Sequence, residues 1–109
     1  MRLTFIETPV FRASARGVVD DADLDDLQER LLHDPRAGPV IVGTGGARKV
    51  RLGVGARGKR AGVRVVYYFH ARSARLYLLL AYPKNAASDL SPAGRRAMKQ
   101  LIAAIERES

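Results

Sequence analysis

The chain has 109 residues, and its 19 Lys and Arg outnumber its 11 Asp and Glu, for a formal net charge of +8. Such a length suits one domain, spanning 1–109, with a single hydrophobic core. The absence of cysteine excludes disulfides, thiolate metal sites and cysteine nucleophiles. No stretch approaches the ~20 apolar residues of a membrane span, and the N-terminal residues lack the apolar run of a signal peptide. We therefore expect a soluble cytoplasmic protein without a membrane partner.

The first third of the chain predicts one strand and two helices. A short apolar run at 3–6 is typical of a strand. Pro9 and Gly17 stand where a short helix would begin and end. Residues 21–33 repeat Leu at helical spacing behind capping aspartates, which predicts a second helix that ends at Pro35.

The middle of the chain changes to a two-residue period, which indicates strands. The runs at 49–54, 63–69 and 76–82 predict an antiparallel meander, with a glycine-rich hairpin loop at 53–62. Pro92 opens a last helix with one apolar stripe. The order predicts an α+β fold: an N-terminal strand and two helices, an antiparallel sheet of about four strands, and a C-terminal helix.

Charge is segregated along the chain. From Pro35 to Ser88 there is no Asp or Glu among eleven Lys and Arg, whereas residues 20–34 hold seven acids and one Arg. Like charges that crowd one surface repel, and a polyanion relieves that cost. The basic stretch therefore indicates nucleic acid as a partner. The acidic stretch fits ordinary choices near a helix start, although a docking role stays open.

Two nucleotide-binding motifs match by letter only. Residues 53–58 fit G-x-G-x-x-G, and residues 53–59 fit the core of a P-loop. Both motifs need a strand before and a helix after, so that phosphate meets a helix N-terminus. Here a strand follows, and Arg60 stands where a P-loop needs Ser or Thr. We therefore expect no nucleotide site, and the glycines instead favour close approach of a basic hairpin to a phosphate backbone.

Strand alternation gathers some of the basic residues. Lys49 and Arg51 share one face of their strand, and Arg64 shares a face with His70 on the next. If the strands pair, Lys49, Arg51 and Arg64 lie on one open face of the sheet, and His70 is a possible acid–base group. The expected contacts to nucleic acid are Arg48, Lys59, Arg60, Tyr68 and Tyr82, the tyrosines by stacking. The alternative is a solvated basic face without a site.

Several segments together resemble the RelE/ParE toxin superfamily, with the HigB-like type II toxins as the closest branch. The resemblance covers essentially the whole chain and rests on FIETP at 5–9, VIVGTGGARKVR at 40–51, GKRAGVRVVYY at 58–68, LLLAYPKN at 78–85 and DLS at 89–91. It implies a bacterial toxin that is neutralised by an antitoxin, often a helix-turn-helix protein. RelE-like members cut mRNA on the ribosome, whereas ParE-like members poison DNA gyrase and lack the nuclease residues.

The resemblance also implies site residues. The basic positions that contact and polarise the scissile phosphate fall on Lys49, Arg51, Arg64 and Lys84. Some RelE-like proteins carry a catalytic tyrosine after the last strand, but this chain has none after Tyr82. No cofactor or metal is expected.

The expected activity is a ribosome-dependent mRNA endoribonuclease, in which the 2′-hydroxyl of RNA attacks the neighbouring phosphate. Arginines suit this task because the planar guanidinium donates two parallel hydrogen bonds to phosphate. A gyrase-binding toxin without nuclease activity and a basic nucleic-acid-binding domain without catalysis are the alternatives.

Overall fold

The computed structural model describes residues 2–53, 62–84 and 89–108. Its elements in chain order are β1 (Thr4–Glu7), α1 (Pro9–Ala15), α2 (Asp21–His33), β2 (Arg48–Leu52), β3 (Val63–His70), the short 3-10 helix η2 (Ala71–Ser73), β4 (Arg75–Pro83) and α3 (Pro92–Glu108). The predicted helices and strands are all present, but most of the predicted hairpin loop lies outside the described residues. In the described part, no helix has the length and apolar character needed to cross a membrane.

The four strands form one sheet in the order β1-β4-β3-β2. Strands β2, β3 and β4 pair antiparallel, as predicted, whereas β1 lies parallel to β4 at the sheet edge. Parallel neighbours need a long connection, and here the two helices and two further strands provide it. The α+β prediction is confirmed, with a mixed sheet in place of a purely antiparallel one.

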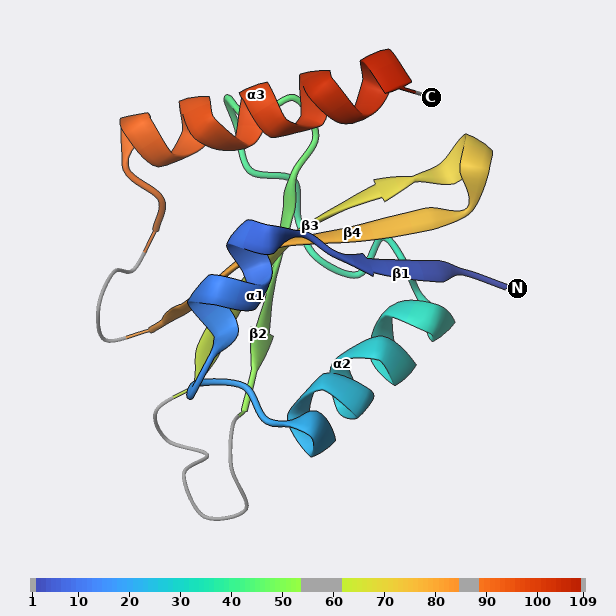
Figure 1. Cartoon of the computed structure of the whole chain (residues 1–109), viewed down its shortest axis with the longest axis vertical. Coiled ribbons are helices and arrows are strands. Elements are labelled where there is room, and N and C mark those ends of the chain that lie inside the picture. The colour runs from blue at the N-terminus through green and yellow to red at the C-terminus, as the bar shows by residue number, and fades with distance from the viewer. Residues whose placement is uncertain (1, 54–61, 85–88, 109) are drawn as a thin grey trace.

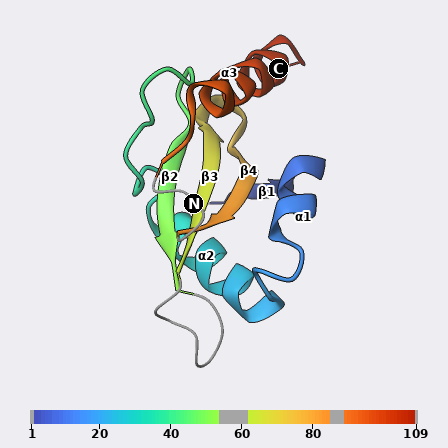
Figure 2. The same cartoon turned by 90° about the vertical axis from the view of Figure 1, so that its left-hand side faces the viewer.

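Helices cover both faces of the sheet (Figure 1). On one face, Phe11 of α1 and Leu27 of α2 pack with strand residues in a buried cluster. On the other face, Met98 and Ile102 of α3 pack with Val66 in a second cluster. Figure 2 shows from the side how far α3 lies from α2.

The second cluster corrects two expectations. A chain of this length was expected to hold one core, yet the sheet separates two. The face that carries Lys49, Arg51 and Arg64 was expected to be open, yet α3 covers much of it. The error arose because the apolar stripe of the last helix does not say which sheet face it covers.

Side-chain caps fix the first two helices. Thr8 accepts a hydrogen bond from the amide of Phe11, and Asp20 and Asp23 form a reciprocal capping box at the start of α2. Gly17, between the helices, has a φ of 74°, which only glycine adopts at little cost. Two of the acids in the acidic stretch therefore serve the cap, while a docking role for the others stays a prediction.

A tight glycine turn leads into β2. Gly45 and Gly46 have φ of 80° and 120°, and a Cβ at Gly46 would stand 3.3 Å from the Tyr68 ring. Thr44, which precedes them, is fully buried. Its Oγ1 donates to the Ile41 carbonyl at 2.7 Å and accepts from the Ala47 amide at 3.0 Å. The G-T-G-G letters thus have a structural reason: this backbone has to bend sharply against the ring of Tyr68.

A β-bulge interrupts the pairing of β3 with β4. Val66 pairs with Leu80, but the next residue, Tyr67, pairs with Leu78, so that Leu79 is the extra residue. Because of it, Leu79 and Leu80 both pack in the cluster beneath α3. At the bulge, the alternation of β4 side chains between the α1–α2 face and the α3 face therefore shifts by one residue.

Candidate nucleic-acid interface

Three cations lie beside one another on the α3 face of the sheet. Arg51 of β2 and Arg64 of β3 are directly opposed across the strand pair, and Lys49 is two residues before Arg51. On one face of an antiparallel pair, opposed side chains approach closely, and like charges there are destabilising. The strands thus hold positive charge together at a cost in stability, which indicates a ligand that offsets it.

The start of α3 adds a carboxylate and a fourth cation. Asp89 Oδ1 lies 3.3 Å from Lys49 Nζ, and Asp89 Oδ2 lies 3.2 Å from Arg95 Nη2. The Leu90 amide also donates to Asp89 Oδ1, at 2.9 Å. This amide, together with Lys49 and Arg95, holds the pKa of Asp89 below its ordinary value. We call Lys49, Arg51, Arg64 and Arg95 the cationic cluster.

Three polar atoms around the cationic cluster are buried without a hydrogen-bond partner in the described part of the chain. They are Arg64 Nε, Arg95 Nε and the Tyr82 hydroxyl. Tyr82 is the cross-strand neighbour of Arg64. Burial, and next the Asp89 carboxylate, raises the pKa of Tyr82 above its ordinary 10.0, so its hydroxyl stays protonated at neutral pH. Buried donors without partners are uncommon in folded proteins, and each of these three can still donate to an acceptor oxygen.

The structure therefore brings together three of the four residues expected to be catalytic. Lys84 follows β4 at the same end of the sheet, where its amide donates to the Gly62 carbonyl at 3.0 Å. Lys59 and Arg60 lie outside the described residues. Sequence reasoning did not find Asp89 or Arg95. The one available signal was that Asp89 is the first acid after the acid-free stretch.

Two other expected contacts, Arg48 and Tyr68, lie on another face or are already hydrogen-bonded. Arg48 points to the other face, where its Nη1 donates to the carbonyls of Arg36 and Gly38 at 3.3 and 2.8 Å. The Tyr68 hydroxyl donates to the Glu106 carboxylate of α3. Burial, and next this hydrogen bond, raises the pKa of Tyr68 to about 12. Contacts of Arg48 and Tyr68 with RNA remain predictions, and neither residue belongs to the cationic cluster.

His70 ends β3, six residues from Arg64, which is about 20 Å along an extended strand. It is buried, with Nδ1 2.6 Å from Ser73 Oγ and Nε2 3.5 Å from Glu106. The cavity beside it, about 280 Å³, is also lined by Arg72. In this geometry His70 is too far from the cationic cluster for an acid–base role there. Its contact with Glu106 instead holds the end of α3 against the sheet.

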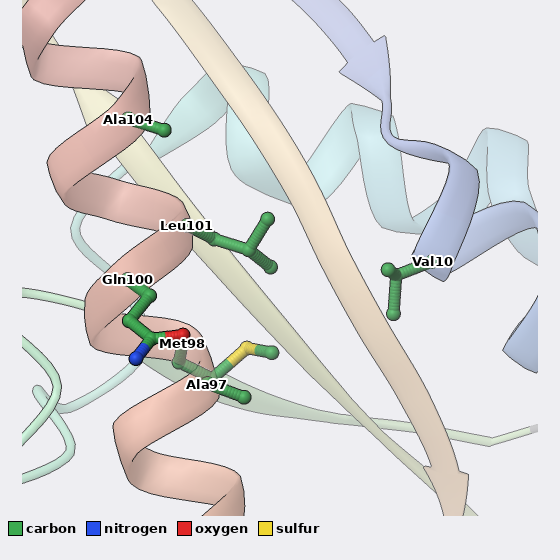
Figure 3. A pocket seen from close by; sticks show the side chains of 6 residues that line it. All are labelled: Val10, Ala97, Met98, Gln100, Leu101 and Ala104. Atoms are coloured by element: carbon green, nitrogen blue, oxygen red, sulfur yellow. The ribbon is translucent and has the colours of Figure 1, made fainter.

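A second hollow, of about 340 Å³, lies between α1 and α3 (Figure 3). Val10 faces Met98 and Leu101 across it, and Gln100 is the one lining side chain with a polar group. Among the described residues, no group of three His, Asp or Glu side chains is arranged to hold a metal ion. In the part of the chain that the structure describes, the cationic cluster is therefore the best candidate for a functional site.

The fold has a counterpart among solved structures. It is similar to an E. coli toxin RelE mutant, in which two arginines are replaced by alanine, in the free state. The TM-score is 0.58 at 15% sequence identity, over 81% of this chain and 90% of that chain. No protein-family model matches the chain. The likeness shows a RelE-like fold for this chain.

Proposed function

We propose that this chain is the toxin of a type II toxin–antitoxin pair, of the HigB-like branch, and that it cleaves mRNA on the ribosome. The observation that carries the proposal is the cross-strand pair Arg51–Arg64 with Lys49 beside it, on a RelE-like fold. A structural role alone does not account for opposed arginines, because they weaken the strand pair. A phosphodiester would turn the same arrangement into a binding site.

The cleavage needs no covalent bond to the protein. The 2′-oxygen forms a bond to phosphorus while the bond from phosphorus to the 5′-oxygen breaks. A base takes the 2′-hydroxyl proton, and an acid supplies a proton to the departing 5′-oxygen. The products are a 2′,3′-cyclic phosphate and a 5′-hydroxyl end. The protein has to align the reacting atoms and stabilise the added negative charge.

The cationic cluster offers groups for these tasks. Arg51 and Arg64 would stabilise the charge on the phosphate oxygens, because guanidinium groups donate paired hydrogen bonds to them. Lys49 or Lys84 would move a proton. The Tyr82 hydroxyl, protonated and without a partner in the described residues, would donate to a phosphate oxygen. Lys59 and Arg60 would hold the RNA strand.

A map of mRNA 5′ ends after brief expression tests the proposal. Wild type should create discrete new ends within reading frames. Arg64→Ala should reduce them on the order of 100-fold, as the loss of one donor to a developing anion does. Arg72→Ala is the matched control, because Arg72 is exposed at the far end of the sheet. Equal cleavage by wild type and Arg64→Ala would contradict the role of Arg64.

Two other functions predict different results. A toxin that binds gyrase without cutting RNA would leave mRNA intact and block supercoiling by purified gyrase. A binding domain without catalysis would do neither. The proposed partners are mRNA, the ribosome and an antitoxin with a helix-turn-helix fold, and a small reading frame of that kind beside the gene would support the pairing.

A further inference from the structure

Asp89 places a carboxylate against a surface that otherwise gathers positive charge. Its two oxygens contact different cations, Lys49 on β2 and Arg95 on α3. A phosphodiester also carries one negative charge and presents two free oxygens. The carboxylate therefore makes the kind of contacts that a bound phosphodiester would make.

We propose that the Asp89 carboxylate takes the place of a phosphate in the free protein and is displaced when a phosphate group binds to the cationic cluster. The inference rests on the proposed function, because it assumes that this cluster receives a phosphate. In this inference the Asp89 carboxylate competes with external anions for the cationic cluster, and an anion must bind strongly enough to displace it.

The contacts of Asp89 are suited to exchange. Its distances of 3.2 and 3.3 Å to the two cations are longer than the 2.7–2.9 Å typical of strong charge-assisted hydrogen bonds. Its side chain is 47% exposed, so water screens both ion pairs. Little stability is therefore lost when the carboxylate turns toward solvent.

A phosphate would gain contacts that Asp89 does not make. With Asp89 in place, Arg64 Nε, Arg95 Nε and the Tyr82 hydroxyl still find no partner in the described residues. A tetrahedral phosphate directs its oxygens out of the plane that a carboxylate occupies, so it can reach donors that the carboxylate leaves unpaired. The exchange therefore favours a ligand that spans the sheet and the start of α3 over a small anion that meets one cation.

Titration of ¹⁵N-labelled protein with inorganic phosphate at pH 7 and constant ionic strength tests the exchange. Wild type is compared with Asp89→Asn and with Asp26→Asn, which makes the same charge change at an exposed position of α2. Removal of two exposed ion pairs should lower the dissociation constant of Asp89→Asn about three- to tenfold. Asp26→Asn should stay near wild type. In wild type, phosphate should also shift the Leu90 amide signal, because that amide loses its acceptor.

The outcomes separate the exchange from the proposed function. Phosphate binding by Asp89→Asn that is no tighter than by Asp26→Asn overturns the exchange, as does an absence of phosphate binding in all three proteins. If mRNA is nevertheless cut in an Arg64-dependent manner, the proposed function stands without the exchange. If phosphate binds as expected but mRNA stays intact, the exchange stands and the proposed function fails.

Discussion

The opposed arginines of β2 and β3 should make the free protein less stable than it could be. For two charges about 8 Å apart, 332/(εr) gives roughly 0.5–1 kcal/mol at an effective dielectric constant of 40–80. Lys49 adds a smaller repulsion from its diagonal position on the same face. Arg51→Gln should therefore raise the free energy of unfolding by about 0.5–1 kcal/mol in 20 mM salt, while mRNA cleavage falls.

A matched variant separates this repulsion from the general effect of net charge. Arg75→Gln makes the same substitution on a strand, but Arg75 is opposed by Thr4 and His70 rather than by another Arg or a Lys. Urea unfolding of both variants should be followed in 20 mM and 500 mM salt. The advantage of Arg51→Gln over Arg75→Gln should shrink to about a fifth at high salt, where the Debye length is only about 4 Å. No advantage at low salt, or one that salt leaves unchanged, would refute the reasoning.

Three further predictions concern the core and the alkaline range. Tyr67→Phe should destabilise by about 1–3 kcal/mol in urea unfolding, because the buried Tyr67 hydroxyl donates to the Pro35 carbonyl at 2.8 Å and accepts from the Gly38 amide at 3.0 Å. Gly38→Ala should cost several kcal/mol in the same assay, because its Cβ would stand 2.4 Å from a backbone oxygen. Burial raises the pKa of Tyr67, Tyr68 and Tyr82, the second to about 12. The folded state therefore keeps these phenolic protons to a higher pH than the unfolded state does. The free energy of unfolding should be constant with respect to these groups below pH 10 and should fall as pH rises further. Absorbance at 295 nm should show that these tyrosines ionise at a higher pH in the folded protein than in the unfolded protein. Ionisation of all tyrosines around pH 10 in the folded protein would contradict the prediction.

Much of the fold could be predicted because its elements carry local signals. Capping residues and leucine spacing defined α2, and strand alternation placed Lys49 and Arg51 on one face. The same alternation puts Arg48 on the opposite face, a consequence that the predicted RNA contacts did not use. These signals depend on neighbours in the chain, so a sequence reports them well.

The part of the site that the sequence did not predict depends on how segments distant in the chain pack together. Asp89 reaches Lys49, and Arg95 reaches Asp89, only because α3 returns across the sheet, and no periodicity encodes that return. The bulge in β4 is equally hidden, since residues 76–81 are apolar on both faces and show no alternation to interrupt. The face of Tyr82 therefore could not be fixed before the structure was known.

The single extra residue in β4 also determines what a deletion in this strand would do. Tyr82 is an even number of residues from Leu78, yet the two side chains belong to clusters on opposite faces, because Leu79 shifts the alternation between them. Loss of any one residue between them would restore the regular alternation and leave Tyr82 opposite Arg64, whereas pairing without the bulge in a chain of the present length would turn Tyr82 to the other face. In an alignment of related sequences, a one-residue gap at this point would thus mark a chain that lacks the bulge but whose tyrosine still faces the arginine.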